Sequence, residues 1–433
     1  MRRFLAALFL LALAPGLAHA GVPETWLIAV DRWGNAEYQE AVIETDGGVL
    51  TGRLGAMPLT GQRDGAAIAF IATDPDGDSY RFTGTVAADR LSGSADYPDT
   101  NGSDARVSHP FTGRRLEMPA EGAPRRVTFE PQTWSNTFTA DREPVLVIRP
   151  GDIVATRTID SGGVDANGDT KALYGNPQTG PFYVAGARPG DILAIHIRRL
   201  TLNRDYADSL DDLVGRAMTT RLAAEATDLG NRVRWRLDRE AGTARLENPP
   251  ERLKDYVVPV RPMLGGLGVA PDFGYAPFSA GDTGRFGGNM DFNEIREGAT
   301  VYLGVSQPGA LLFLGDGHAL QGDGETTQWA LETSLDVEFS VEVLSPRAMS
   351  APRVETADRI SVIGQAGSLD EAVRAATAGM IQWLAQDYQL TVAESSLILG
   401  TAAEYRVVTL AGRNAGMALS LDKARLAGLP RRP

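Results

Sequence analysis

The strongest constraint on the fold is a pattern of short alternating segments that end in glycine-containing turns. In the segment 335–344, LDVEFSVEVL, apolar residues alternate with acidic and polar ones almost without error. A period of two is that of a β-strand with one buried and one solvated face, so the acidic residues of this segment are expected in solvent. Similar segments lie between the turns WGN, DGG and DPDGD of the N-terminal region. The chain is therefore predicted to be mainly β.

Four segments are predicted along the 433 residues. Residues 1–20 combine a basic start, a short apolar run and a small-residue end. This pattern is typical of a cleavable signal peptide and predicts a periplasmic or secreted protein. Residues 21–115 predict a small antiparallel β-barrel or β-sandwich, and the proline- and glycine-rich residues 116–126 predict a linker. Residues 127–433 form the predicted main domain.

The main domain is expected to be a β-sandwich with a C-terminal helical pair. The PGD sequences at 150–152 and 189–191 each stand between two apolar segments, which predicts a duplicated hairpin. From Ser368 to Tyr388 a helix N-cap pattern precedes apolar residues at helical spacing, and a second helix is expected from Thr391.

Composition excludes several classes of protein. The net charge of −13 argues against binding to nucleic acid or to an anionic membrane surface, and no later apolar run is long enough to span a bilayer. The sequence contains no cysteine. It therefore has no disulfide, no lipid-anchored cysteine and no thiol nucleophile. A small neutral or cationic substrate is compatible with the charge.

Three glycine-rich loops carry polar residues that folding alone does not require. Carboxylates with an imidazole can bind a divalent ion, which polarises a carbonyl and activates water. Alternatively, a carboxylate can act as general base while backbone N–H groups stabilise the oxyanion. The spacing of these residues does not decide between a metal site, a general-base site and simple solvated turns. The candidates are Asp160, Asp165, Asn167 and Asp169 in the first loop, Asn289, Asp291 and Glu294 in the second, and Asp316, His318, Asp323 and Glu325 in the third.

Several longer motifs resemble those of the acetamidase/formamidase family. They are NPQTGPFYVAGARPGDILAIHI, PMLGGLGVAP, GGNMDFNEIREGATVYLGV and GALLFLGDGHALQGDGE, followed by the helix SLDEAVRAATAGMIQWL. The resemblance covers roughly residues 127–415. It implies a β-sandwich-based enzyme that hydrolyses short aliphatic amides to a carboxylate and ammonia. It also implies a divalent metal, zinc or calcium, and a homodimer.

The matching positions are assigned roles by this resemblance. We expect Asp316, His318 and Asp291 to bind the metal. Glu325 is expected to act as general base towards water, and Asn289, with the adjacent glycine backbone, to orient the carbonyl. Asp323, in the GDGE part of the same motif, is a further catalytic candidate.

Two positions depart from the family pattern. Phe286 stands where the family commonly has histidine, and Ala185 stands where it commonly has a carboxylate. These departures keep a second function open, that of a non-catalytic extracytoplasmic relative that binds a metal or a glycan. The expected function is that of an exported, metal-assisted hydrolase of short linear amides. Its expected partner is the small amide, with neither nucleic acid nor a membrane anchor.

Overall fold

The computed structural model describes residues 22–99, 101 and 105–431. The predicted signal peptide at 1–20 lies outside these residues. The chain divides into two compact units, the first ending at Leu116 and the second beginning at Glu117, except that Asn35–Tyr38 group with the second. Residues 117–125 belong to no helix or strand.

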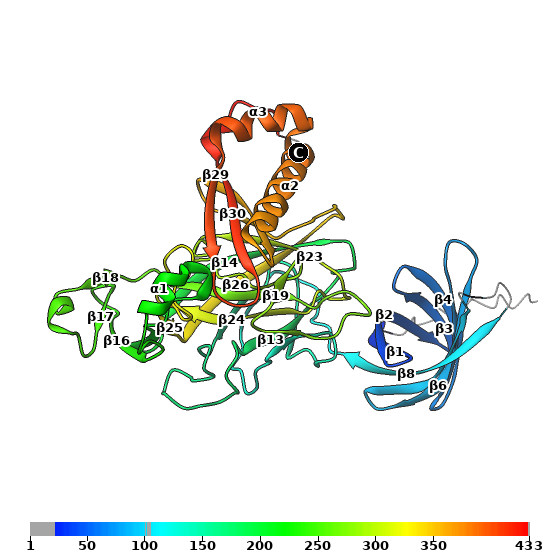
Figure 1. Ribbon diagram of the computed structural model, residues 1–433. Helices are drawn as coiled ribbons and strands as arrows, with labels where there is room; N and C mark the ends of the chain where they lie inside the picture. Colours follow the sequence, from blue (N-terminus) through cyan, green and yellow to red (C-terminus); the bar gives the residue numbers. More distant parts are fainter. Residues whose placement is uncertain (1–21, 100, 102–104, 432–433) are drawn as a thin grey trace, which may run out of the picture. The chain divides into compact units, whose positions relative to one another are not determined.

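The first unit is a closed antiparallel barrel (Figure 1). Each strand pairs with the next, and the last pairs back with the first. Aromatic side chains fill the interior, where the rings of Phe70 and Phe82 stack 4.6 Å apart. The predicted all-β module is thus a barrel. Its strands are β1 (Glu24–Arg32), β2 (Asn35–Asp46), β3 (Val49–Leu54), β4 (Met57–Asp64), β5 (Ala67–Thr73), β6 (Ser79–Ala87), β7 (Arg90–Pro98) and β8 (Arg106–Leu116).

The second unit is built on two large sheets. The site sheet has the order β18-β17-β16-β15-β25-β24-β19-β22-β21, with β13 pairing to β24 and β11 to β13. The back sheet has the order β29-β30-β28-β27-β23-β14-β26-β12-β9. Phe182 of β13 and Phe339 of β26 bring their rings 5.2 Å apart, so the two sheets pack face to face. The predicted fold class, mainly β with a sandwich, is confirmed.

The strands of these sheets are short. In the site sheet they are β11 (Leu146–Ile148), β13 (Gln178–Val184), β15 (Tyr206–Leu210), β16 (Arg232–Asp238), β17 (Thr243–Leu246), β18 (Val257–Pro259), β19 (Met263–Val269), β21 (Thr283–Gly284), β22 (Gly287–Asn289), β24 (Leu312–His318) and β25 (Glu332–Thr333). In the back sheet they are β9 (Arg126–Thr128), β12 (Ile153–Arg157), β14 (Ile192–Leu202), β23 (Thr300–Gly304), β26 (Leu335–Leu344), β27 (Arg353–Glu355), β28 (Arg359–Ala366), β29 (Glu404–Thr409) and β30 (Ala415–Asp422). A small separate pair joins β10 (Thr137–Phe138) to β20 (Phe278–Ser279).

The two PGD turns share one geometry, but they do not close hairpins. In each turn the aspartate carboxylate accepts the N–H three residues earlier, from Arg149 to Asp152 at 3.0 Å and from Arg188 to Asp191 at 2.9 Å. The strands before the turns, β11 and β13, pair in parallel in the site sheet, whereas β12 and β14 lie in the back sheet on either side of β26. The predicted duplicated hairpin is therefore wrong. Each turn carries the chain from one sheet to the other, and a corner of that kind needs the same glycine and aspartate as a hairpin.

The predicted helical pair consists of α2 (Leu369–Tyr388) and α3 (Val392–Ala402), which follow one another in Figure 1. Ser368 caps α2 by accepting the Glu371 N–H, and Thr391 begins α3 with a capping box. The α2 backbone approaches β28 at Gly364, where a Cβ would lie 2.0 Å from a helix carbonyl oxygen. A short helix, α1 (Thr220–Glu225), and 3₁₀ turns at 215–217, 251–253 and 423–425 complete the elements.

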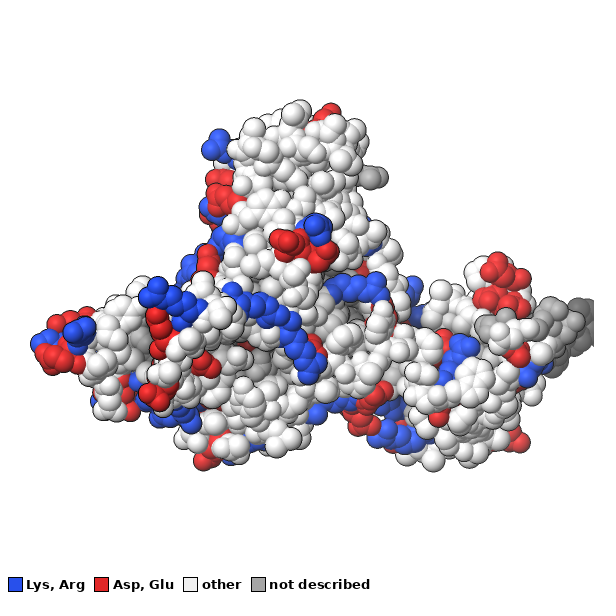
Figure 2. Space-filling model, viewed as in Figure 1, with Lys and Arg blue, Asp and Glu red and all other residues white. Residues whose placement is uncertain are grey.

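The surface carries both signs of charge. On the face drawn in Figure 2, acidic and basic side chains are interspersed and form no large patch of one sign. No helix among the described residues is long and apolar enough to cross a membrane.

The duplicated turn offers a matched test of stability. Asp152 is fully buried and also accepts the Arg125 N–H at 2.8 Å and its guanidinium, whereas Asp191 is only partly buried. We expect Asp152→Ala to lower the free energy of unfolding by about 2 kcal/mol, because several donors lose their acceptor. Asp191→Ala should cost less, and denaturant unfolding of both variants measures the difference.

The same comparison depends on pH. Burial opposes the Asp152 charge, but the Arg125 side chain and the backbone donors outweigh it and hold the pKa of Asp152 below its usual range. Stability from a lowered pKa is present in full above the unfolded-state pKa and is lost as pH falls through the folded-state pKa. The penalty of Asp152→Ala should therefore shrink in acid. This account would be contradicted if both alanine variants lost the same free energy of unfolding, or if the loss in Asp152→Ala did not depend on pH.

Candidate active site

A histidine on β24 lies at the centre of a buried carboxylate cluster. Asp316 and His318 are two residues apart on this strand and face the same side, while Gly317 between them faces Leu335. Glu332 of β25 stands directly opposite His318 in the antiparallel register. The Nε2 atom of His318 lies 3.2 Å from a Glu332 oxygen and 3.6 Å from an Asp316 oxygen.

Two more carboxylates reach this histidine from other segments. Asp291 follows β22, and its N–H and that of Met290 both donate to the carbonyl of Gly265 on β19. Glu325 follows Gly324, which bonds to the backbone of β29, and the Thr409 hydroxyl donates to Glu325 Oε2 at 2.9 Å. Donor atoms of Asp291, His318 and Glu325 lie within 4.8 Å of one another, as do those of Asp316, His318 and Glu332.

Three of these carboxylates occupy an unusual backbone conformation. The φ angles of Asp291, Asp316 and Glu325 are +49°, +54° and +40°, in the left-handed region that L-residues seldom adopt. All three side chains are at most 7% exposed. Such strain costs roughly 1–3 kcal/mol per residue and clusters at functional sites. Its recurrence at three members of one cluster marks this place as a site of function.

Amide side chains orient the cluster. The Gln321 amide nitrogen donates to the Asp291 carbonyl, so its oxygen is left to accept His318 Nδ1–H at 2.8 Å. His318 is thereby set to present Nε2 to the carboxylates. Asn289 donates to Asp291 at 2.5 Å and accepts from Asn176 at 2.7 Å, and Asn176 also lies 3.2 Å from an Asp316 oxygen.

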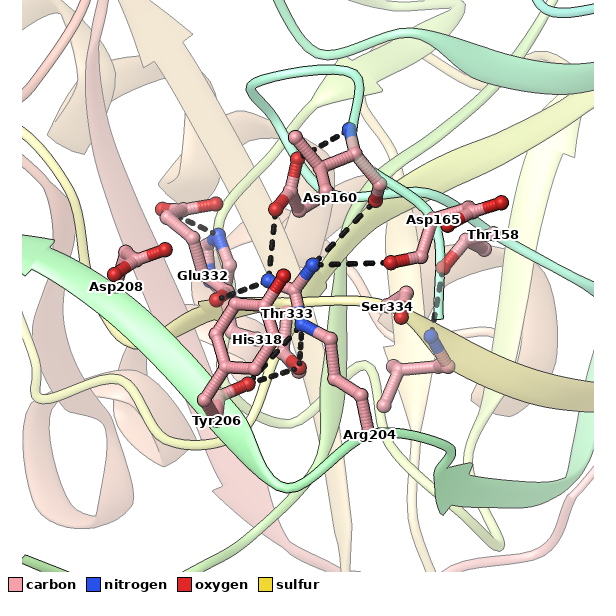
Figure 3. Close-up of polar contacts among 12 residues, drawn as sticks. Thr158, Asp160, Asp165, Arg204, Tyr206, Asp208, His318, Glu332, Thr333 and Ser334 are labelled. Carbon is pink, nitrogen blue, oxygen red and sulfur yellow. Dashed lines mark hydrogen bonds and ion pairs between the residues drawn. The ribbon is translucent and has the colours of Figure 1, made fainter. Parts of the chain in front are cut away.

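A buried ion pair supports the Glu332 side of the cluster (Figure 3). Arg204 is 3% exposed and donates to Asp160 at 2.7 Å, to the Glu332 carbonyl at 3.1 Å and to the Thr333 hydroxyl at 3.1 Å. The Tyr206 ring stacks under its guanidinium at 4.1 Å. Arg204 thus fixes the backbone that presents Glu332, and Asp160 from the first predicted loop acts through it.

Confinement perturbs the protonation of the cluster. Burial, reinforced by repulsion from Asp316, raises the pKa of Asp291 to about 8. Burial and the Asp291 charge likewise raise the pKa of Glu325 well above its usual range. Burial also raises the pKa of Glu332, although His318 opposes the shift. Burial disfavours the charged form of His318, but Glu332 and Asp316 outweigh it and raise its pKa well above the usual range.

The donor set is suited to a divalent cation. Three buried carboxylate oxygens, Asp291 Oδ1, Asp316 Oδ1 and Glu332 Oε2, have no hydrogen-bond donor among the described residues. Gly265 lies against this group, where an added Cβ would come within 2.4–2.5 Å of Asp316 and Asp291 oxygens. Zinc accepts carboxylate oxygens together with an imidazole nitrogen, and calcium accepts the carboxylate oxygens.

The structure separates two predicted residues from the cluster. Asp323 and Glu294 both pair with Arg406, which donates from β29 to Asp323 at 2.5 Å and to Glu294 at 3.1 Å. Burial disfavours the Asp323 charge, but Arg406 and Asn293 outweigh it and hold the pKa of Asp323 below its usual range. Asp323 is therefore a fixed anion in a partly exposed ion-pair network. In the first loop, Asp165 accepts the N–H groups of Asn167 and Asp169 and so closes a turn.

The two family departures lie among packing residues. Phe286 is 5% exposed and stacks on Phe278 at 4.7 Å in an aromatic cluster with Phe138. Ala185 follows β13 and stands seven residues beyond Gln178. Gln178 contacts Gly266 and Gly315, which adjoin the cluster. An extended strand rises about 3.3 Å per residue, so Ala185 is roughly 20 Å from that end of β13. A carboxylate at position 185 would not reach the cluster from there.

A cavity of about 240 Å³ adjoins the cluster. Glu325 and Gln321 line it together with the apolar side chains of Leu210, Trp235 and Trp329. A partly open cavity with apolar walls beside a perturbed carboxylate is the usual setting of a small-molecule site.

Comparisons with known proteins cover the region that contains the cluster. The Acetamidase/Formamidase family model matches residues 281–388, which include all five members of the cluster. The chain contains an acetamidase/formamidase-like domain. A predicted acetamidase/formamidase of Thermoanaerobacter tengcongensis is similar at 26% identity and a TM-score of 0.61, covering 71% of this chain and 98% of that one.

Two further solved structures agree. An acetamidase of Bacillus halodurans is 26% identical, with a TM-score of 0.60 over 70% of this chain and 99% of its own. An acetamidase of Yersinia enterocolitica is 27% identical, with a TM-score of 0.60 over 70% and 93%. No curated protein matches the sequence.

Glu332 of the acetamidase/formamidase-like domain was not foreseen from the sequence. If the alternation of residues 335–344 is extended towards the N-terminus, Glu332 is assigned to the solvated face together with Asp336. The chain changes sheets at Ser334, between β25 and β26, and this change turns Glu332 inward. Asn176 and Gly265, by contrast, stand in two motifs of the family resemblance, and that signal could have identified them.

The close packing at Gly265 can be tested directly. We expect Gly265→Ala to lower the free energy of unfolding by about 1–3 kcal/mol, because the new methyl group must displace two buried carboxylates. Gly400→Ala is a matched control: it lies in α3 with nothing within 4 Å of its Cβ position, and alanine favours the helix. Urea unfolding should show a loss for the first variant and none for the second. An unchanged Gly265→Ala would contradict the packing described.

Proposed function

We propose that this chain hydrolyses short linear aliphatic amides to a carboxylate and ammonia by metal-assisted attack of water. The observation that carries the proposal is the buried cluster in which three strained carboxylates converge on His318 beside a cavity. The similarity to acetamidases supplies the reaction class. A small amide placed in the cavity next to Glu325 would lie within reach of the cluster.

Asp316, His318 and Asp291 would hold the metal, with Glu332 as an additional ligand. The support is that donor atoms of Asp316, His318 and Glu332 lie within 4.8 Å of one another, that Asp291 forms a second such group with His318 and Glu325, and that three of the carboxylates have an unsatisfied oxygen. When bound, a divalent ion polarises a carbonyl oxygen and lowers the pKa of bound water. Carboxylate oxygens together with an imidazole nitrogen form a donor set of zinc, whereas calcium would use the carboxylate oxygens alone.

Glu325 is the proposed general base. It lines the cavity, Thr409 fixes one of its oxygens, and burial raises its pKa towards the range in which a carboxylate accepts a proton efficiently. It would take a proton from the attacking water and return it to the leaving ammonia. Asn289 uses its amide to hold Asn176 and Asp291, so we assign it a positioning role. Asp323, paired with Arg406, is given no role in the reaction.

Substitution of the base separates these assignments. Glu325→Gln keeps the size of the side chain but cannot accept the proton, so kcat for ammonia release should fall by at least about 100-fold. Asp323 lines the same cavity but lies outside the cluster, paired with Arg406, so Asp323→Asn should keep kcat within about tenfold of wild type. Ammonia assays with circular dichroism as a folding check decide the matter. Near-normal turnover in Glu325→Gln, or the reverse ranking of the two variants, would refute the assignment.

Metal dependence requires a separate experiment. Ammonia release from formamide, acetamide and propionamide is measured before chelation, after it, and after adding back zinc or calcium. We expect chelation to abolish release and one ion to restore it, because the donor set holds unsatisfied carboxylates. Full activity in metal-free protein would refute metal assistance. If metal-loaded protein released no ammonia from any of the amides, a non-catalytic relative that binds metal or glycan would be favoured.

We also propose that the protein is exported and that it forms a homodimer. Export to the periplasm or the medium rests on the sequence pattern of residues 1–20. A homodimer is suggested by the family resemblance, and α3 offers an exposed apolar surface in Val392 and Leu397, which are 64% and 73% exposed. The helical region around α3 is largely uncharged on the face drawn in Figure 2.

A further inference from the structure

A second cavity of about 410 Å³ lies beside helix α2. It shares no lining residue with the cavity at Glu325, and its walls belong to the back sheet, helix α2 and the C-terminal segment. Tyr302 and Trp383 form an aromatic wall, with their rings 5.9 Å apart and edge to face. The charged residues of the lining are Arg347, Arg353, Arg431 and Asp387.

Arg353 is a buried cation without a carboxylate of its own. It is 4% exposed and donates to the amide oxygens of Gln386 at 2.8 Å and Gln382 at 3.4 Å. Its Nε atom has no acceptor, and within the described part of the chain no acidic side chain forms an ion pair with it. Its guanidinium carbon lies 5.0 Å from the centre of the Trp383 ring. The Asp387 charge acts on Arg353 without forming an ion pair with it. A desolvated guanidinium that has no hydrogen-bonded carboxylate is costly, which points to a missing anionic partner.

The one carboxylate of the cavity is already engaged. Asp387 accepts from Arg347 at 2.9 Å, from Arg431 at 3.1 Å and from the indole N–H of Trp383 at 3.1 Å. Three guanidinium groups therefore face a single aspartate. The nearby Glu355 does not correct the balance, because it pairs with Lys423 and accepts from Tyr302. The cavity is locally cationic in a chain whose net charge is −13.

We infer that this cavity is a second binding site, for a small organic carboxylate with an apolar or aromatic body. The planar guanidinium groups offer paired donors to a carboxylate, and the Trp383 and Tyr302 walls suit an apolar body. The apolar wall makes inorganic phosphate a poorer match. This inference does not depend on the proposed amide hydrolysis, since it uses none of the cluster residues.

The test uses isothermal titration of the full mature protein with benzoate. Benzyl alcohol, a neutral aromatic molecule of similar size that is not an amide, and inorganic phosphate are titrated in parallel. We expect saturable binding of benzoate, with benzyl alcohol at least about tenfold weaker because it lacks the charge. Equal binding of benzyl alcohol, tighter binding of phosphate, or no binding of benzoate would overturn the inference.

Variants locate the site. Arg353→Gln and Arg347→Gln should each weaken benzoate binding by about tenfold or more. Arg347 is 43% exposed, so its replacement decides the question if Arg353→Gln does not fold. Arg374→Gln, an exposed arginine of α2 paired with Glu371, is the control and should bind benzoate as wild type does. Binding lost in Glu325→Gln but retained in both cavity variants would place benzoate in the acidic cluster and overturn the assignment.

Discussion

The site depends on one constraint: four carboxylates and an imidazole are held within a space that is nearly closed to solvent. Repulsion between like charges at low dielectric would drive such groups apart or force them to take up protons. Backbone and amide hydrogen bonds keep them together, as when the Gly265 carbonyl anchors Asp291 and Gln321 links Asp291 to His318. The fold therefore maintains an electrostatic conflict that a bound cation would relieve.

The topology of the domain follows from this requirement. The cluster draws on β24 and β25, on the residues after β22, and on Glu325, which is fixed by Thr409 of β29. Strand β29 thus belongs to the back sheet and also fixes a residue of the site. Packing of α2 on β28 at Gly364 holds the end of the back sheet that contains this strand. The helical pair thereby supports the site without contributing a ligand to it.

Sequence patterns predicted four of the five residues that the structure brings together in the cluster, and the exceptions have physical causes. Asp291, Asp316, His318 and Glu325 stand in glycine-rich motifs, and the structure places them together. Glu332 was missed because alternation assigns a face only while a strand stays in one sheet. Asp323 looks equivalent to Glu325 in the motif, but Arg406, far along the chain, draws it into another network. The PGD turns were placed correctly, whereas their pairing depended on contacts between distant strands that local chemistry does not specify.

The two cavities of the domain differ in how they treat buried charge. At the cluster the unpaired atoms are carboxyl oxygens, whereas beside α2 the unpaired atom belongs to the guanidinium of Arg353. Neither imbalance helps folding, because an uncompensated buried charge costs more than a neutral side chain of the same size. The unpaired groups are not side chains that simply face solvent either, because Asp291, Asp316, Glu332 and Arg353 are each at most 4% exposed. Binding of a cation at the cluster around His318 and of an anion beside Arg353, the two proposals made above, would account for both imbalances.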